Sequence, residues 1–203
     1  TTIFNNITGS KQKVANYAGV TVDKKEGNRH YKGYDFIVYD LPGVYSLSAY
    51  SIDEMVARDF IIDEKPDIIV NVLDATNLER NLYLLLQFQE LGIPVVSALN
   101  IVDQAEARGI RIDDKTLSKI LGVSIVKTVG TKGIGIEEIL DKVIEIFENK
   151  KLTVNKISYG NELETEVDIL EKFIADDDSF SKIYSPRWFS IKLLEKDKNA
   201  FEI

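Results

Sequence analysis

Short apolar runs alternate with longer stretches in which apolar residues recur at helical spacing along residues 1–150. The short runs predict strands at residues 36–39, 68–73, 94–99 and 123–126. The longer stretches predict helices at residues 52–63, 78–91, 114–121 and 136–148. Because such alternation is typical of a mostly parallel sheet with helices on both faces, the pattern predicts an α/β fold.

Two segments depart from this alternation. Residues 22–34 are polar and predict an exposed edge strand that forms a hairpin with residues 34–39. Beyond residue 150, the segment 151–160 is typical of a linker, and residues 161–203 show only helical patterns. We therefore expect a larger domain at residues 1–150, a linker at 151–160 and a small all-α domain at 161–203.

The all-α domain contains two predicted helices. The first has apolar residues spaced four, three and four apart on one amphipathic face: Leu163, Val167, Leu170 and Ile174. The second begins at Ser185 followed by Pro186, which is typical of a helix N-terminus. Two such helices bury too little apolar surface to be stable alone, so either they dock on the larger domain or the domain continues beyond Ile203. We expect it to be incomplete.

Composition narrows the possible chemistry. The chain has no cysteine and a single histidine, His30, which excludes disulfides, thiolate catalysis, iron–sulfur clusters and multi-histidine sites. A metal, if used, is then expected to be a hard cation held by Asp, Thr and phosphate oxygens. The net charge of −8 disfavours nucleic acid as a partner, because that binding depends on Lys and Arg. No apolar run approaches a membrane span and no signal peptide opens the chain, so we expect a soluble, intracellular segment.

A polar motif follows the predicted strand at 36–39. Residues 40–43 read Asp-Leu-Pro-Gly, and ligands of open parallel sheets bind at the carboxyl ends of the strands. The Asp40 carboxylate can hold Mg²⁺ through a water molecule, and Gly43 can bring its N–H close to a phosphate. The motif therefore predicts a site for magnesium and a phosphate.

Two further loops carry groups suited to a guanine base. Asn100 and Asp103 follow the strand at 94–99 in an N-x-x-D pattern. The Asn amide can bond the Hoogsteen edge of guanine, and the carboxylate can accept from its N1–H and exocyclic amine. The loop at 130–133, Gly-Thr-Lys-Gly, follows the strand at 123–126 and suits backbone contacts with the base.

Each motif also has a purely structural interpretation. Asp40 could be a turn residue, with Pro42 and Gly43 completing the turn. Asn100 and Asp103 could be a helix N-cap and a first-turn acid. Both motifs follow apolar strands directly and in the order that a guanine-nucleotide switch requires, which favours the switch.

A receiver-like domain that is phosphorylated on Asp40 is another alternative. It requires a lysine after a later strand, for which Lys127 and Lys132 are the candidates. It also leaves Asn100 and Asp103 without a role, so the nucleotide switch explains more of the sequence.

The first residues of the chain predict a phosphate-binding loop upstream. A P-loop, G-x-x-x-x-G-K-[ST], leads into a helix, and its last Ser or Thr binds Mg²⁺. Residues 1–9 are typical of the helix after such a loop, with Thr1 as the magnesium ligand and Thr2 as an α-phosphate contact. Since the glycines, the lysine, the preceding strand and an initiator Met lie outside this sequence, we expect the protein to extend upstream.

Longer blocks of the sequence resemble a known family. The runs at 1–9, 19–27, 40–47, 71–86 (NVLDATNLERNLYLLL) and 91–103 (LGIPVVSALNIVD) are similar to the cytosolic G domain of the ferrous iron transport protein B (FeoB) family of bacteria and archaea. The resemblance covers nearly the whole chain, and the block at 71–86 is more specific than any four-residue motif. It implies a P-loop NTPase G-domain, followed by a small helical domain that precedes a membrane part.

The resemblance also assigns roles to individual residues. Thr21 would be the switch I threonine and Gly43 the switch II glycine, both contacting the γ-phosphate. Thr1, Thr21 and Asp40 would hold Mg²⁺, while the backbone near Ala15 and Tyr17 would hold a potassium ion with a P-loop asparagine. The residues implied to bind GTP or GDP are Thr1, Thr2, Gly19, Val20, Thr21, Asp40, Leu41, Pro42, Gly43, Asn100, Asp103, Gly130, Thr131 and Lys132.

Several positions depart from the family pattern. Ile101 stands where Lys is usual in N-K-x-D, which removes an aliphatic cover over the base. Tyr17 and Ala18 stand where Trp and Pro are common in the potassium loop. Val44 follows Gly43 where many small G proteins carry a water-orienting glutamine, so we expect slow hydrolysis and assign no general base.

Taken as a whole, the resemblance implies a switch that hydrolyses GTP to GDP and phosphate, slowly and with potassium stimulation. It implies that this switch regulates or drives ferrous iron uptake by an attached membrane transporter domain, at the cytoplasmic side of the cell membrane. The alternative is a regulatory module that holds guanine nucleotide with negligible hydrolysis. The sequence leaves the oligomeric state open.

Overall fold

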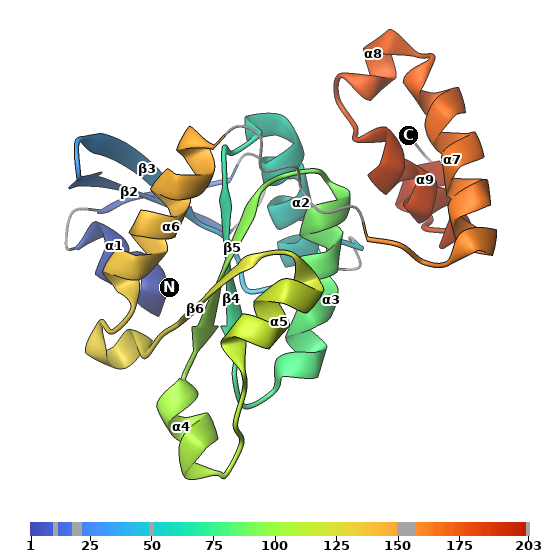
Figure 1. Ribbon diagram of the computed structural model, residues 1–203. Helices are drawn as coiled ribbons and strands as arrows, with labels where there is room; N and C mark the ends of the chain where they lie inside the picture. Colours follow the sequence, from blue (N-terminus) through green and yellow to red (C-terminus); the bar gives the residue numbers. More distant parts are fainter. Residues whose placement is uncertain (10–11, 18–21, 49–50, 150–156, 202–203) are drawn as a thin grey trace.

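The structure is a computed structural model that describes residues 1–9, 12–17, 22–48, 51–149 and 157–201 (Figure 1). The strands are β1 (Gln12–Asn16), β2 (Asp23–Tyr31), β3 (Tyr34–Asp40), β4 (Ile69–Asp74), β5 (Val95–Asn100) and β6 (Ser124–Lys127). The helices are α1 (Thr2–Thr8), α2 (Ile52–Glu64), α3 (Leu78–Glu90), α4 (Val102–Ala107), α5 (Asp114–Leu121), α6 (Ile136–Glu148), α7 (Asn161–Ala175), α8 (Asp178–Ser181) and α9 (Pro186–Leu194), with short 3₁₀ turns η1 (Gly130–Lys132) and η2 (Asn199–Phe201).

The strands form two three-stranded sheets. The order β4-β5-β6 is parallel, as the alternation of strands and helices predicts. The order β1-β2-β3 is antiparallel, and its β2–β3 hairpin is the predicted one. The strand β1 was not predicted, because QKVAN contains no run of apolar residues. The helices α4 and α8 were also missed, since six and four residues are too few to display a helical period.

Helices cover both faces of the parallel sheet, which confirms the predicted layering (Figure 1). One face packs against α2 and α3 through Phe60, Leu85 and Phe88. The other face packs against α1 and α6 through Ile3 and Ile139. A cavity of about 390 Å³ lies between β3, the residues before β4, the end of α2 and α6. One edge each of β3 and β4 is unpaired in the described part of the chain.

The helices α7, α8 and α9 form a separate module beside α2 and α3 (Figure 1). Ser185 caps α9 by accepting from the Trp188 N–H, as predicted, and Pro186 opens the helix. Trp188 and Phe189 are buried together with Ile62 of α2, so the module docks on the larger domain. The prediction for α7 is correct for Val167 and Ile174, which are buried, and wrong for Leu163, which is 49% exposed because no described element covers that end of the helix face.

A buried carboxylate lies at the junction of α3 with this module. The Glu90 carboxylate accepts a hydrogen bond from the Tyr159 hydroxyl, and the Glu90 carbonyl accepts one from Ser185 Oγ at 3.2 Å. Burial raises the pKa of Glu90 to about 7; the negative charge of Glu195 adds to the rise, while Lys192 and Arg187 oppose it. The junction therefore holds a carboxyl group that prefers its neutral form.

In the described part of the chain no helix is long and apolar enough to span a membrane.

Candidate functional site

A threonine and an aspartate meet where β3 ends and α1 begins. Thr1 precedes α1, and its hydroxyl donates to Asp40 Oδ2 at 2.9 Å. Asp40 is the last residue of β3, and only 13% of its side chain is exposed. No group of three or more His, Asp or Glu side chains among the described residues could hold a metal. A hydroxyl and a carboxylate do fit Mg²⁺, which takes one or two protein oxygens and completes its shell with water and phosphate.

A cavity of about 350 Å³ opens beside this pair. Its lining contains Thr1 and the whole Asp40–Gly43 motif, so these sequence-predicted residues lie around one space. It also contains four residues that sequence reasoning missed: Val22, Asp23, Lys25 and Asp53. The first two could have been found, since they follow Thr21 directly. Lys25 lines the cavity because β2 pairs with β3, and Asp53 lines it because α2 begins beside it. Neither arrangement can be recognised from the local sequence.

The residues predicted to contact a base form a second group. Asn100, at the end of β5, accepts at Oδ1 from the Gly130 N–H at 2.9 Å and from the Thr128 hydroxyl at 3.2 Å. The Gly130 carbonyl accepts from Asn6 Nδ2 of α1 at 2.6 Å. Asn100 is therefore no helix N-cap: residue Ile101 holds that position of α4 and makes no side-chain cap. The Asn100 side chain instead ties the end of β5 to η1.

Asp103 and Lys132 form the outer part of this group. The Lys132 ammonium lies 2.9 Å from Asp103 Oδ2, and this hydrogen bond lowers the pKa of the Asp103 carboxyl. Asp103 lies in the first turn of α4, so that part of the structural interpretation is correct. Ile101 adopts a left-handed conformation, with φ 55°, which turns the chain between Asn100 and Asp103. Thr131 lies exposed in the same loop.

Helix α1 joins the two groups. Its N-cap Thr1 bonds Asp40, whereas the next residue, Thr2, lies against Gly130. A Cβ added at Gly130 would lie 3.3 Å from Thr2 Cγ2 and 3.3 Å from Asn100 Oδ1, so no side chain fits there without a shift. The structure thus brings Thr1, Thr2, the 40–43 motif, Asn100, Asp103 and the 130–132 loop around the start of one helix.

The remaining predicted residues belong to switch I and to the potassium site. Gly19, Val20 and Thr21 lie outside the described residues. Ala15 belongs to β1, opposite Lys24, and the Tyr17 N–H donates to the Val22 carbonyl at 2.9 Å. The Tyr17 ring packs edge-on against Phe60, and burial, with Asp40 and Glu64 nearby, raises the Tyr17 pKa to about 12.

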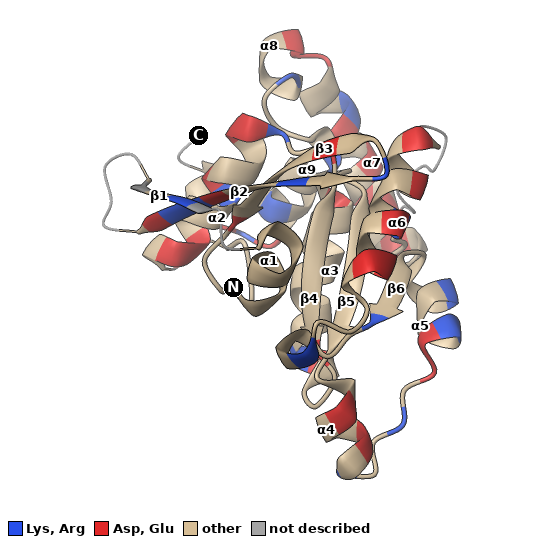
Figure 2. Ribbon diagram, turned by 90° about the vertical axis from the view of Figure 1, so that its left-hand side faces the viewer, with Lys and Arg blue, Asp and Glu red and all other residues tan. Residues whose placement is uncertain are grey.

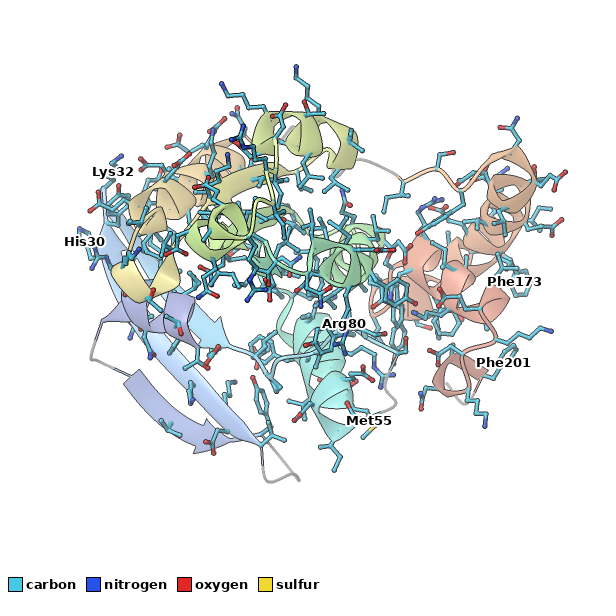
Figure 3. All side chains as sticks on the ribbon, turned by 90° about the horizontal axis from the view of Figure 1, so that it is seen from below. His30, Lys32, Met55, Arg80, Phe173 and Phe201 are labelled. Atoms are coloured by element: carbon cyan, nitrogen blue, oxygen red, sulfur yellow. The ribbon has the colours of Figure 1, made fainter. Side chains whose placement is uncertain are left out.

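The segment after Gly43 is fastened to α3. The guanidinium of Arg80 stacks over the Tyr45 ring at 3.5 Å, and Arg80 extends from α3 in Figure 3. The Leu47 N–H donates to Gln87 Oε1 at 2.6 Å, and the Leu47 side chain is buried. Sequence reasoning gave Arg80 and Gln87 no role, because their partners are far away in the sequence.

The receiver-like alternative loses its lysines. The Lys127 ammonium lies 2.8 Å from Asp114, and the Lys132 ammonium is paired with Asp103. Neither lysine is paired with Asp40, whose carboxylate receives the Thr1 hydroxyl instead. The arrangement that a receiver domain requires is therefore not present.

Comparison with known families gives two matches. Residues 1–143 match the family model described as "Ferrous iron transport protein B", and residues 159–203 match "FeoB cytosolic helical domain". Together they cover most of the chain, and the boundary between them falls close to the predicted linker.

Curated proteins and solved structures agree with these matches. The chain is 44% identical to an Fe(2+) transport protein A/Fe(2+) transporter FeoB fusion protein of Porphyromonas gingivalis, covering 98% of the chain and 24% of that protein. It is 42% identical to the Fe(2+) transporter FeoB of Escherichia coli K12, covering 97% of the chain and 25% of that protein. The chain thus spans about a quarter of the length of these relatives.

Among solved structures, the cytosolic domain of the T. maritima FeoB iron transporter in its GMPPNP form is 40% identical, with a TM-score of 0.90 over 99% of this chain and 78% of that one. The cytosolic domain of L. pneumophila FeoB is 37% identical, with a TM-score of 0.85 over 98% of this chain and 84% of that one.

Proposed function

The chain belongs to the ferrous iron transport protein B family, and on that premise we propose that it is a guanine-nucleotide-binding switch that hydrolyses GTP to GDP and phosphate. One observation carries the proposal: two separate polar groups, one suited to a base and one to Mg²⁺ and phosphate, lie around the start of α1. GMPPNP and GDP forms of the T. maritima relative support it.

The base would be selected by Asn100 and Asp103. Since Asn100 Oδ1 already accepts from Gly130 and Thr128, its amide is oriented and its Nδ2 remains available to donate to the Hoogsteen edge of guanine. The Asp103 carboxylate would accept from guanine N1–H and the exocyclic amine. Adenine presents an acceptor at N1 where this carboxylate needs a donor, so it would be rejected. Gly130, Thr131 and Lys132 would line the base.

The phosphates would lie on the Thr1 and Asp40 side. Thr1 would bind Mg²⁺ directly and Asp40 through water, together with Thr21, and the ion would neutralise the phosphate charge. Thr2 would contact the α-phosphate. Gly43 would offer its N–H to the γ-phosphate, with Gly19, Val20, Leu41 and Pro42 shaping the two switch segments.

Hydrolysis would be slow. The residue after Gly43 is Val44, whose side chain has no polar atom to orient the attacking water, and we assign no side chain as a general base. The backbone near Ala15 and Tyr17 would hold a potassium ion that adds positive charge beside the phosphates. Loss of the γ-phosphate would release the contacts of Thr21 and Gly43, and Tyr45 and Leu47 would carry that change to α3.

We also propose the domain limits 1–150, 151–160 and 161–203, with a strand and a P-loop that precede Thr1 in the natural protein and further helical chain that follows. The unpaired edges of β3 and β4, and the cavity of about 390 Å³ that β3 and the residues before β4 line, support a strand at that place. The relatives are about four times as long, which supports an attached membrane transporter domain with this switch at the cytoplasmic side, regulating or driving ferrous iron uptake.

A second candidate is a regulatory module that binds guanine nucleotide with negligible hydrolysis. The apolar Val44 favours it. Single-turnover hydrolysis with and without potassium separates the two candidates: a negligible rate that potassium does not change excludes the enzyme.

Calorimetric titration with GDP, XDP and ADP in Mg²⁺ buffer tests the proposed function. The unsubstituted chain should bind GDP and not ADP. Asp103→Asn should lose at least about 100-fold in GDP affinity and gain XDP binding, because the new amide donates to the 2-oxo group of xanthine. Glu106→Gln, an equal charge change on the same helix, should alter neither. Equal binding of GDP and ADP would contradict the proposal.

A further inference from the structure

The cavity beside Thr1 and Asp40 has an uneven distribution of charge. Three carboxylates line it, Asp23, Asp40 and Asp53, against a single basic side chain among its lining residues, Lys25. An anion that enters this space is repelled by the carboxylates unless a cation stands nearby. Among the described lining residues, Lys25 supplies such a cation, beside the Mg²⁺ ion and the P-loop lysine that the proposed function places at the phosphates.

Strand pairing aims Lys25 at the same side as Asp40. The two residues are directly opposite in the antiparallel β2–β3 ladder, so their side chains project from the same face of the sheet. Gly27, two residues further along β2, packs on that face against Thr8 of α1. Lys25 thus lies on the face that carries α1 and the Thr1–Asp40 pair. Figure 2 shows basic and acidic positions along β2 beside α1.

The neighbouring lysine occupies the opposite face and is fully engaged. Lys24 places its ammonium 5.0 Å from the Tyr39 ring centre, 5.1 Å from that of Phe60 and 3.5 Å from Glu64 Oε1. The Lys25 ammonium makes no hydrogen bond or ion pair with the described residues, although Lys25 stands opposite Asp40. An ammonium without a partner on the wall of a cavity is available to a ligand.

We propose that Lys25 binds an oxygen of the terminal phosphate of a nucleoside triphosphate and so makes the site prefer triphosphate over diphosphate. The inference rests on the proposed function and adds a phosphate-binding residue to it. A lysine ammonium suits this role because it is a compact charge on a flexible stem that donates up to three hydrogen bonds.

The competing interpretation is that Lys25 only offsets the charge of Asp40. The two interpretations predict different effects on triphosphate preference and on Mg²⁺ affinity. If Lys25 binds phosphate, its removal weakens triphosphate binding. If it only offsets Asp40, its removal leaves the carboxylate more negative, and Mg²⁺ binds more tightly while the preference for triphosphate stays unchanged.

Titration calorimetry with GDP and with a non-hydrolysable imido analogue of GTP, at saturating Mg²⁺, tests the proposal. Lys25→Met and Lys25→Gln should each lower the affinity for the triphosphate analogue about 10-fold and change GDP affinity less than about 2-fold. Lys25→Arg should retain most of the preference. Lys24→Met is the matched control on the opposite face and should leave the ratio of the two affinities unchanged.

Failure of the proposal and failure of the proposed function give different results. If the unsubstituted chain binds GDP but the Lys25 variants keep the same triphosphate preference, the role of Lys25 is wrong and the guanine site stands. If Mg²⁺ binds the GDP complex of Lys25→Met more tightly and the triphosphate preference is unchanged, Lys25 only offsets the charge of Asp40. If neither this chain nor the protein extended upstream through the proposed P-loop binds a guanine nucleotide, the proposed function itself is wrong, and the role of Lys25 is wrong with it.

Discussion

The base half and the phosphate half of the candidate site are built in different ways. In the base half, Asn100, Thr128, Gly130 and Asn6 are joined by direct hydrogen bonds of 2.6 to 3.2 Å. In the phosphate half, the Thr1 hydroxyl bonds Asp40 at 2.9 Å beside a cavity of about 350 Å³. Among the described residues the base half is therefore the more fully hydrogen-bonded of the two, and the proposed upstream P-loop would add protein groups to the phosphate half.

This difference separates two tasks of a switch. A base pocket that is already hydrogen-bonded pays little ordering entropy on binding, so it can hold the base equally in the diphosphate and triphosphate states. In the proposed function, a γ-phosphate and a cation would add contacts around the Thr1–Asp40 pair, so this half would change with the nucleotide state. The proposal thus assigns base selection to the first half and detection of the γ-phosphate to the second.

The largest effect is expected from breaking the base half. Asn100→Ala removes the proposed base contact and leaves the Gly130 N–H without its partner, so GDP affinity should fall about 100-fold. Titration calorimetry measures this loss. Asn77→Ala is the matched control, since Asn77 follows another strand and its side chain makes no cap. A change of less than about 3-fold in Asn100→Ala would show that the hydrogen-bonded loop is only structural.

A smaller effect, confined to magnesium, is expected in the phosphate half. Asp40→Asn keeps a partner for the Thr1 hydroxyl but loses the charge that favours Mg²⁺, so binding of the triphosphate analogue should weaken about 10-fold with Mg²⁺ present. With a chelator the variant and the unsubstituted chain should bind alike. Asp53→Asn lines the same cavity without the Thr1 bond and serves as the control. An equal loss in the chelator would contradict a role through the cation.

The smallest effect on nucleotide affinity is expected from a change at the junction with the helical module, because this junction lies outside the base half and the phosphate half. The pKa of Glu90 is raised to about 7 in the folded chain, so the folded state binds more protons than the unfolded state between about pH 4.5 and 7. Its contribution to stability is complete below that window and is lost as the pH rises through it. Between pH 5 and pH 8 the unsubstituted chain should therefore lose about 2 kcal/mol in its free energy of unfolding through Glu90. In Glu90→Gln this loss should be absent.

Denaturant unfolding at the two pH values measures this change, and GDP affinity should stay the same. Glu162→Gln, on the exposed first turn of α7, is the matched control. If the pH dependence of the unsubstituted chain is retained in Glu90→Gln, another group is responsible for it.

The sequence was sufficient to locate the strand ends and the motifs that follow them. Asp40 and Asn100 could be placed because hydrophobic runs end directly before them. The state of the Asn100 side chain could not be predicted, since an Asn after a strand can cap a helix or reach a distant loop. The tertiary contact with Gly130 decides this, together with the left-handed Ile101, a conformation that β-branched residues seldom adopt.

The residues that escaped prediction depend on pairing between segments. Lys25 lies in a polar strand without a hydrophobic period, and only the register with Asp40 shows which face it occupies. Leu163 fits the helical stripe of α7 but remains exposed, because periodicity tells which side chains share a face and not whether another element covers that face.

Thr1 and Thr2 are consecutive residues, yet they stand in different halves of the site. A single peptide unit links Thr1, whose hydroxyl donates to Asp40, to Thr2, whose methyl group lies against Gly130 with no spare room. A motion that pulls Thr1 away from Asp40 therefore also shifts Thr2 relative to Gly130 and the η1 loop. In the proposed function, cation escape and base release would then share one mechanical step, and nucleotide exchange would require a concerted opening.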